Sequence, residues 1–272
     1  MNLLSYHENM QRGTPDFPVE YHYIEFSHPK YFMQMHWHKD FEIIRVLKGS
    51  FTLHLNSAIF TLNEDGCAVI PGGIIHGGEP EKCVYECLVF SPSVLYTSQK
   101  CRSLIKAHFQ SPVIYEKSDI ADGIFDAVRS HKHGYELRLT GMLFSLMGSI
   151  AASELKTDIL PDEKLEKIKS VMSLIEENYN KKLTLGDLAD ACHMSPNYFS
   201  RYFKTLTNRT PFEYIINCRL EAACEMLLNT NDDITDICFS CGFNDLSYFI
   251  HIFKRHRGVS PNNYRKKRGN LI

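Results

Sequence analysis

The sequence lacks features that would place the protein in several other classes. No apolar run approaches the roughly 20 residues of a membrane-spanning helix, so contact with a membrane is not expected. The first residues, MNLLSYHENMQRG, have no basic segment followed by an apolar stretch, which argues against a secretion signal. A disulfide framework is not expected either, because the nine cysteines are odd in number and many stand in apolar contexts. Reduced thiols of this kind predict a cytoplasmic protein.

The cysteines also give little support for a metal or redox site of their own. Cys238 and Cys241 have CxxC spacing, but no second pair accompanies them. We interpret them as small buried residues.

The charge is unevenly distributed along the chain. The 272 residues carry a formal net charge of −2, which divides into −5 for residues 1–162 and +3 for residues 163–272. The most basic stretch is KRHRGVSPNNYRKKRGN, near the C-terminus. A basic second half joined to an acidic first half favours contact of the second half with a polyanion, although solvated surfaces also carry such an excess.

Residues 1–115 show the pattern of short β-strands. FEIIRVLKG, SFTLHLN, SAIFTLN, GCAVIPG and VYECLVFS are rich in β-branched and aromatic residues and are separated by Gly, Asn, Asp and Pro. Phe51 and Leu53 alternate with Thr52 and His54, as in a strand with one buried face. Regularly spaced short strands predict a sandwich or a barrel.

Helical patterns follow the predicted strands. Ser118 or its neighbour is expected to cap a first helix, and a second helix is expected over residues 135–156. Pro161 interrupts the pattern, so residues 157–163 are predicted to be a linker. The helices of residues 116–156 are expected to form an extension of the β domain. Their apolar face has two alternative roles, which are simple packing on that domain and formation of a dimer interface.

Residues 164–268 contain an internal repeat. SPNYFSRYFK returns as DLSYFIHIFK, and the pairs Thr210-Pro211 and Ser260-Pro261 are 50 residues apart. Each copy has the pattern of a short helix, a tight turn and a second helix, over about 183–206 and 233–256, and a connecting helix joins the two. That connecting helix, of about 18 residues, would be roughly 27 Å long.

The second helix of each copy has an aromatic side and a polar side. The aromatic side of the first copy consists of Tyr198, Phe199, Tyr202, Phe203 and Leu206, and the polar side consists of Asn197, Ser200, Arg201 and Lys204. This is typical of a helix-turn-helix, in which the apolar side holds the helix on the domain while the polar side enters the major groove. Two such helices predict binding to successive major grooves of DNA, which lie about 34 Å apart.

The second copy resembles the DNA-binding domain of AraC/XylS-family transcriptional regulators. ITDICFSCGFNDLSYFIHIFKRHRGVSPNNYRKK agrees with the family pattern at about a dozen positions in order and spacing, including Gly242-Phe243 and Ser260-Pro261. The resemblance implies that residues 164–268 bind double-stranded DNA. It also implies a homodimer, with RNA polymerase as a further partner.

By that resemblance, the DNA contacts lie on the polar sides of the two helices. Base-edge contacts are expected from Asn197, Ser200, Arg201, Ser247, Ile250 and His251, and phosphate contacts from Lys204, Lys254, Arg255 and Arg257. His251 stands where many members have arginine, and Ile250 is apolar, so the first copy is expected to dominate sequence recognition. Asn208 replaces the glycine found at position 258, and asparagine tolerates the left-handed conformation.

Two segments of the β domain resemble the cupin motifs. HWHKDFEIIRVLKG fits H-x-H-x3-E-x6-G, and PGGIIH fits P-x-G-x2-H. The resemblance implies that His36, His38, Glu42 and His76 converge inside a barrel, where they could hold a metal ion. The match is incomplete, because no glycine precedes His36 at the expected offset and Gly66 is one residue closer to Pro71 than in the pattern.

Two interpretations of this pocket remain open. Three imidazoles and one carboxylate suit Fe(II), Mn(II), Ni(II) or Zn(II), which would make the protein a metal-dependent cupin enzyme or a metal sensor fused to a DNA-binding domain. In AraC-family proteins, however, this domain normally binds an effector such as a sugar, and no cofactor is required. The effector pocket is then expected to contain Trp37, His38, Glu42 and His76, with Arg45 at its rim.

We favour a regulator without enzymatic activity that responds to a small molecule, most commonly as an activator. The expected fold has two domains. An all-β, cupin-like barrel of jelly-roll type with flanking helices is followed by an all-α domain with two helix-turn-helix units.

Overall fold

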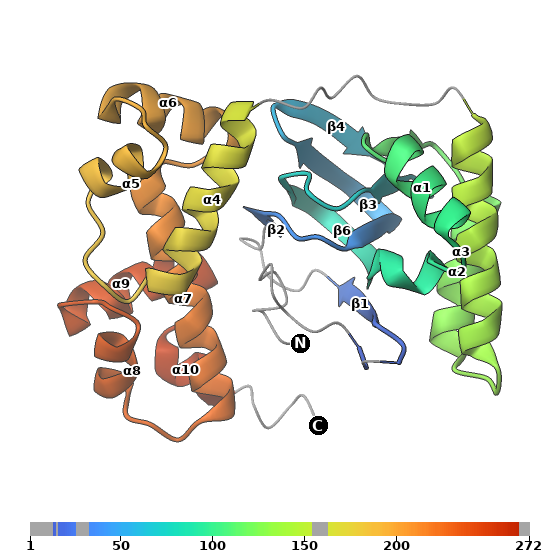
Figure 1. Ribbon diagram of the computed structural model, residues 1–272. Helices are drawn as coiled ribbons and strands as arrows, with labels where there is room; N and C mark the ends of the chain where they lie inside the picture. Colours follow the sequence, from blue (N-terminus) through green and yellow to red (C-terminus); the bar gives the residue numbers. More distant parts are fainter. Residues whose placement is uncertain (1–12, 15, 26–32, 154–162, 267–272) are drawn as a thin grey trace. The chain divides into compact units, whose positions relative to one another are not determined.

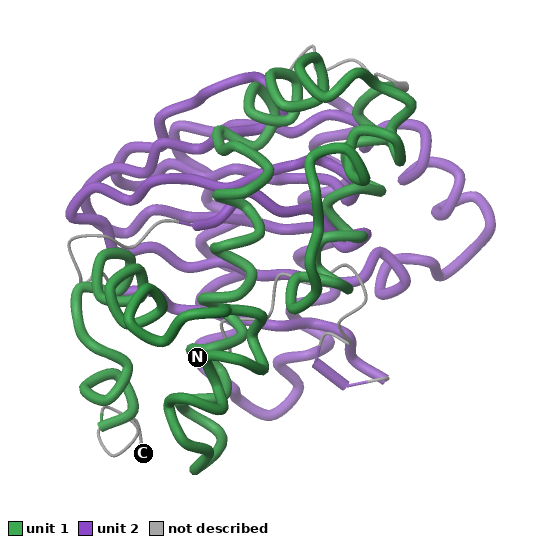
Figure 2. The backbone as a smooth tube through the Cα atoms, turned by 90° about the vertical axis from the view of Figure 1, so that its left-hand side faces the viewer, with its two compact units in different colours: residues 1–7, 27–31, 161–272 green, residues 8–26, 32–160 purple. Residues whose placement is uncertain are grey.

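The computed structural model describes residues 13–14, 16–25, 33–153 and 163–266, which divide into two units (Figure 2). Residues up to 153 form a β-rich unit with helices on it, and residues from 163 form an all-helical unit (Figure 1). These units confirm the predicted fold class. Within the described ranges, no helix is long and apolar enough to cross a bilayer.

The β-rich unit is built on one antiparallel sheet. Its strands are β1 (Val19–Glu25), β2 (Met33–His36), β3 (Phe41–Leu55), β4 (Ala58–Leu62), β5 (Cys67–Ile70), β6 (His76–Phe90) and β7 (Val113–Tyr115). The strand order is β1-β6-β3-β5-β7, with β2 paired to β6 and β4 paired to β3. Two of the predicted strands, FEIIRVLKG and SFTLHLN, are halves of the single strand β3.

A bend in the ribbon formed by β3 and β6 positions the interior residues. The register between the two strands shifts twice around Gly49, whose φ is +80°. A Cβ atom at this position would lie 2.4 Å from the carbonyl oxygen of Lys82, so the bulge requires glycine. Because the ribbon bends here, Glu42 near one end of β3 approaches His76, which pairs with Leu55 at the other end.

Helices cover one face of the sheet. They are the short 3-10 helix η1 (Pro92–Leu95), α1 (Gln99–His108), α2 (Asp119–Ser130) and α3 (Tyr135–Ala152). The core between them and the sheet contains Phe41, Ile43, Leu88, Phe90, Phe125, Leu139, Leu143 and Leu146. The sequence did not predict α1, because Ile105 is the buried residue of that helix and one buried position produces no periodic pattern.

The segment between the units was predicted as a linker over residues 157–163. Residues 154–162 lie outside the described residues, and α4 begins at Glu163. The second predicted helix, over 135–156, is described as α3 up to Ala152.

The helical unit contains the two predicted helix pairs. Its helices are α4 (Glu163–Asn178), α5 (Leu185–Ala191), α6 (Pro196–Thr207), α7 (Pro211–Asn229), α8 (Ile234–Ser240), α9 (Leu246–Arg257) and α10 (Pro261–Lys266). Figure 1 shows α5 and α6 at one end of α7 and α8 and α9 at the other. With 19 residues, α7 is about 28 Å long.

Local capping explains where these helices begin and end. Thr210 accepts a hydrogen bond from the N–H of Glu213, and the carboxylate of Glu213 accepts one from the N–H of Thr210, which forms a capping box ahead of α7. Asn208 ends α6 with a φ of +55°, and Gly258 ends α9 with a φ of +74°. The left-handed conformation predicted for Asn208 is therefore confirmed.

The turn between α8 and α9 provides a first testable prediction. Gly242 has a φ of +85°, and a Cβ atom there would lie 2.7 Å from the backbone of Asn180. We expect Gly242→Ala to lower the free energy of unfolding of the helical unit by about 2–3 kcal/mol, because the strained φ and the steric clash add. Chemical denaturation followed by circular dichroism measures this loss.

Gly186 in α5 offers the matched control. A Cβ atom at Gly186 would meet its nearest neighbour, Thr184 Oγ1, at an ordinary 3.6 Å. Gly186→Ala is therefore expected to be neutral or to stabilise the unit by up to about 1 kcal/mol. Equal stability of the two variants would contradict the close approach at Gly242.

Candidate functional site

The predicted DNA-contacting sides of α6 and α9 face solvent. Exposed residues are Asn197, Arg201 and Lys204 of α6 and Ser247, Ile250, His251, Lys254 and Arg255 of α9, while Ser200 is half-buried. The opposite sides are buried and contain Phe199, Phe203, Leu206, Phe249, Ile252 and Phe253. Each helix is thus anchored by its apolar side and offers its polar side to a partner.

The buried side of α6 is narrower than predicted. Tyr198 is 38% exposed, stacks on Tyr202 with ring centroids 5.9 Å apart, and accepts a hydrogen bond from Lys164 Nζ at 3.0 Å. Tyr248 in α9 is also exposed. The phenylalanines therefore form the core, whereas the tyrosines keep their hydroxyl groups near water, where hydrogen bonds are available.

Arg257, for which a phosphate contact is predicted, is paired within the protein. Its Nη2 lies 2.5 Å from Glu221 Oε1 of α7, and its side chain is only 13% exposed. The physical reason is helical periodicity. Arg257 follows Phe249 and Phe253 at intervals of four, so it continues their buried side.

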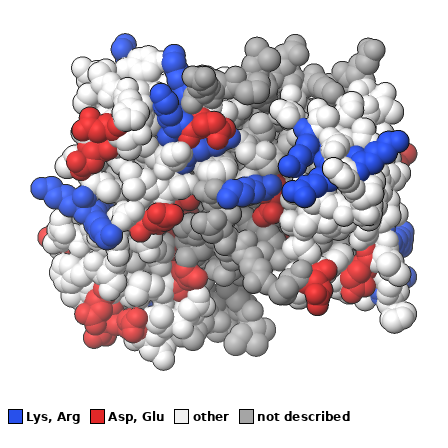
Figure 3. Space-filling model, in the orientation of Figure 1, with Lys and Arg blue, Asp and Glu red and all other residues white. Residues whose placement is uncertain are grey.

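The charges on the visible face are mixed. Figure 3 shows Lys and Arg side chains interspersed with Asp and Glu on that face. Independently of that view, Arg201 of α6 and Lys254 of α9 are exposed cations.

The β-rich unit brings the four predicted ligands together. His36 ends β2, His38 follows it, Glu42 lies in β3, and His76 begins β6 opposite His36. One ligand atom from each lies within 4.8 Å of the others, and all four residues are at most 2% exposed. Trp37, between the first two histidines, is half-buried. We call His36, His38, Glu42 and His76 the His–Glu cluster.

Backbone carbonyl groups fix how the three rings are oriented. The distances from Nδ1 to the carbonyl oxygen are 2.8 Å for His36 and Gln34, 3.0 Å for His38 and Asp40, and 2.8 Å for His76 and Ile74. A carbonyl oxygen can only accept, so each Nδ1 carries a proton and donates it. Each Nε2 is then a lone pair when the ring is neutral.

The protonation of two members follows from their surroundings. Burial, together with the neighbouring rings of His76 and His38, holds the pKa of His36 well below its usual value. Burial alone would raise the pKa of Glu42, but the contacts of its carboxylate with the imidazoles of His38 and His76 outweigh burial and hold that pKa well below its usual value. At neutral pH the cluster therefore contains a neutral His36 and an ionised Glu42.

Arg45, predicted at the rim of the effector pocket, has its contacts away from the His–Glu cluster. Its Nη2 is 2.7 Å from Glu86 Oε1, it also pairs with Asp122 of α2, and its guanidinium lies 5.2 Å from the centroid of the Phe125 ring. Glu42 and Arg45 are three residues apart in β3, and side chains at odd separations point to opposite faces of a strand.

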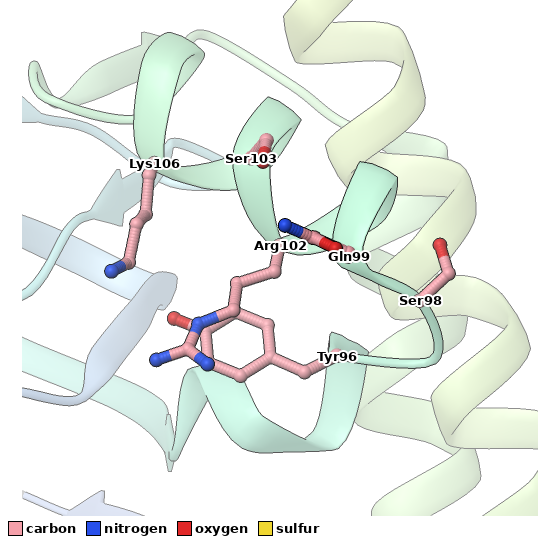
Figure 4. Close-up of a pocket in the computed structure, with 6 residues that line it drawn as sticks. All are labelled: Tyr96, Ser98, Gln99, Arg102, Ser103 and Lys106. Carbon is pink, nitrogen blue, oxygen red and sulfur yellow. The ribbon is translucent and has the colours of Figure 1, made fainter.

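A separate pocket of about 580 Å³ lies at the start of α1 (Figure 4). It is lined by Tyr96, Ser98, Gln99, Arg102, Ser103 and Lys106. The guanidinium of Arg102 lies 5.2 Å from the centroid of the Tyr96 ring. None of these residues belongs to the effector pocket predicted from the sequence.

Comparisons with known proteins match both units. Residues 18–156 match the family model of the AraC-like ligand binding domain, and residues 188–267 match that of a helix-turn-helix domain. An uncharacterized HTH-type transcriptional regulator of Bacillus subtilis, YdeC, is 25% identical over 252 residues, which cover 86% of this chain and 87% of YdeC.

Two further comparisons concern an activator and a solved structure. The HTH-type transcriptional activator RhaS of Mannheimia succiniciproducens is 27% identical over 148 residues, covering 54% of this chain and 55% of RhaS. A solved structure of ToxT from Vibrio cholerae matches with a TM-score of 0.52 at 14% identity, covering 92% of this chain and 98% of ToxT. This last similarity shows a shared fold.

Proposed function

The chain belongs to the AraC family of DNA-binding transcriptional regulators, and we propose that a small molecule bound in its β domain controls how it binds DNA. Family membership makes the protein a regulator rather than an enzyme. The observation that carries the DNA-binding part is the exposure of the polar sides of α6 and α9 on helices whose other sides are buried. One chain would place α6 and α9 in successive major grooves.

For the effector, we propose a sugar or a related metabolite bound near Trp37, His38, Glu42 and His76. Its support is chemical, because the buried imidazoles and the carboxylate of the His–Glu cluster can hydrogen-bond to hydroxyl groups. Effector binding can control DNA binding only through a difference in affinity for two states of the protein. Activation is the proposed outcome, with RNA polymerase as partner, and the similarity to the activator RhaS supports it.

A homodimer is proposed through the exposed side of α3. Leu137 is 82% exposed, and Gly141 and Gly148 lie along the same stripe, with no atom within 4 Å of a Cβ added to either. A second chain would double the number of reading helices on an operator and so raise its affinity. We also assign the protein to the cytoplasm, on the basis of its DNA target and nine free thiols.

Arg201→Ala tests the assignment of α6 as the main reading helix. The loss of an exposed arginine that contacts a base edge is expected to cost about 1–3 kcal/mol, or roughly a 5- to 150-fold loss of affinity, with relaxed specificity at one base pair. Fluorescence anisotropy should be measured with a duplex selected from a random pool by the wild-type protein, and with single-base variants of it.

Lys254→Ala is the matched control on α9. As a phosphate contact, Lys254 should weaken binding to all duplexes alike and lower the slope of log affinity against log salt by about 1. Unchanged affinity of Arg201→Ala for the selected duplex, or a loss that is the same for every sequence, would remove Arg201 from the base readers.

A further inference from the structure

The pocket at the start of α1 lies in a segment that differs in charge from the rest of its half of the chain. Residues 1–162 carry a net charge of −5, whereas residues 87–115 contain Lys100, Arg102 and Lys106 and no Asp or Glu. Arg102 and Lys106 line the pocket, and no acidic side chain does. The pocket is therefore a positively charged site in an acidic half of the protein.

Helical geometry brings the two cations of the pocket together. Arg102 and Lys106 are four residues apart in α1, so their side chains leave the same side of the helix (Figure 4). The guanidinium of Arg102 lies 5.2 Å from the centroid of the Tyr96 ring. A guanidinium that is stacked on an aromatic ring has a restricted orientation, which prepares its N–H groups for a ligand.

The ion pairs of the described residues include neither of these cations. Arg102 contacts the Tyr96 ring, and the backbone carbonyl group of Lys106 accepts a hydrogen bond from Gln110. Like charges four residues apart on a helix repel each other. An anion bound between Arg102 and Lys106 would remove this repulsion without breaking an ion pair within the protein.

A phosphoryl group matches the two cations in charge and geometry. A phosphate monoester carries about 1.5 to 2 negative charges at pH 7 and three oxygens that accept hydrogen bonds, whereas a carboxylate carries a single charge. The fork of Arg102 can donate to two of these oxygens, and the ammonium group of Lys106 acts as a point charge beside them. Both cations are thus used by one phosphoryl group.

The rest of the pocket is polar and uncharged. Its lining includes Ser98, Gln99 and Ser103, which offer hydroxyl and amide groups. The volume of about 580 Å³ is larger than a single phosphate ion needs and is typical of a site for a small organic ligand. An organic part that carries hydroxyl groups suits this lining better than an apolar one.

We propose that this pocket binds a small phosphorylated molecule that also carries hydroxyl groups. Arg102 and Lys106 hold its phosphoryl group. Ser98, Gln99 and Ser103 bond to its hydroxyl groups. None of these residues belongs to the proposed effector pocket or to the DNA-facing helices, so the inference goes beyond the proposed function and does not rest on it.

The test is calorimetric titration of the full chain, in a low-salt buffer without phosphate or sulfate. The probes are glucose 6-phosphate, glycerol 3-phosphate and inorganic phosphate. We expect one site per chain and at least one phosphate ester that binds about 10-fold or more tightly than inorganic phosphate, because its hydroxyl groups add hydrogen bonds. If no probe binds at about 10 mM, or if inorganic phosphate binds as tightly as both esters, the proposal is wrong.

Variants of exposed residues locate the bound ester. Arg102→Gln and Lys106→Gln are each expected to weaken its binding at least about 10-fold, since each removes a charge-assisted hydrogen bond. Lys100→Gln is the matched control, because it removes the same charge from the same helix but does not line the pocket; it should change the affinity less than about 3-fold. All three side chains are exposed, so the Tm of each variant should match that of the wild type.

The same titrations distinguish this pocket from the proposed effector pocket. Glu42→Gln, in the His–Glu cluster, should bind the ester as the wild type does. If Glu42→Gln loses binding, or if Arg102→Gln and Lys106→Gln bind as tightly as Lys100→Gln, the ester is bound elsewhere and the proposal is overturned. Failure of the wild type to bind any DNA duplex, with the ester bound at α1, would count against the proposed function alone.

Discussion

Arg45→Ala is expected to lower the free energy of unfolding of the β-rich unit by about 3–5 kcal/mol. Arg45 is paired with Glu86, which is fully buried, and with Asp122 of α2. Removing the guanidinium leaves a buried carboxylate without its main counter-charge, and the desolvation of that carboxylate is no longer offset. Tyr21 still donates to Glu86 at 2.8 Å, but a single neutral donor replaces only part of the lost interaction.

Trp37 makes this measurement specific. It is the one tryptophan of the chain and lies in the β-rich unit, so its fluorescence during urea denaturation follows that unit. Arg129→Ala is the control, because Arg129 approaches the same Glu86 at 3.5 Å but has a side chain that is 36% exposed. An exposed pair of this kind contributes at most about 1 kcal/mol.

Two further outcomes test the assignment of Arg45. Arg45→Lys should fall between the wild type and Arg45→Ala, since lysine keeps the charge but not the fork that reaches Glu86 and Asp122 together. If Arg45→Ala lost no more stability than Arg129→Ala, the buried pair would not be the stabilising contact proposed here.

Arg257→Ala is expected to destabilise the helical unit by about 3 kcal/mol, near the lower limit for breaking a buried ion pair. Its partner Glu221 is 18% exposed, and the pair joins the end of α9 to α7. Denaturation followed by far-ultraviolet circular dichroism measures the loss. Under conditions where the variant is folded, its affinity for DNA and the salt dependence of that affinity should match those of the wild type.

Glu221→Ala distinguishes a structural Arg257 from one that binds phosphate. If the pair is structural, Glu221→Ala should cost a similar amount of stability, and the double variant should lose clearly less than the sum of the two. If Arg257 contacted phosphate instead, Arg257→Ala would lower the salt slope while stability stayed unchanged. Lys254→Ala is expected to show that second behaviour, since Lys254 is exposed.

Much of the helical unit could be predicted because its signals are local. Apolar residues at intervals of three and four mark the buried sides, and Pro196, Pro211 and Pro261 mark the starts of three helices. Two copies of the same pattern made the helix-turn-helix assignment specific. The periodicity assigned Tyr198 to the buried side of α6, although it is partly exposed, and Arg257 to the exposed side of α9, although it is largely buried. The width of a buried side depends on what packs against the helix, which the periodicity does not contain.

Some features of the β-rich unit could not be predicted from local sequence patterns. The cupin-like spacing identified His36, His38, Glu42 and His76, but their meeting depends on the bend at Gly49, which the spacing does not contain. Helix α1 went unpredicted, because a single buried residue leaves no periodic trace.

By itself, the sequence determined which residues carry ligand chemistry and which sides of the helices are polar, since backbone periodicity over a few residues decides both. Only the tertiary structure decided which charged side chains form ion pairs inside the protein. Arg45 pairs with Asp122, which is 77 residues away in the sequence, and Arg257 pairs with Glu221, which is 36 residues away. Partners so distant in sequence are selected when helices pack on a sheet or on each other, and no local pattern records that packing.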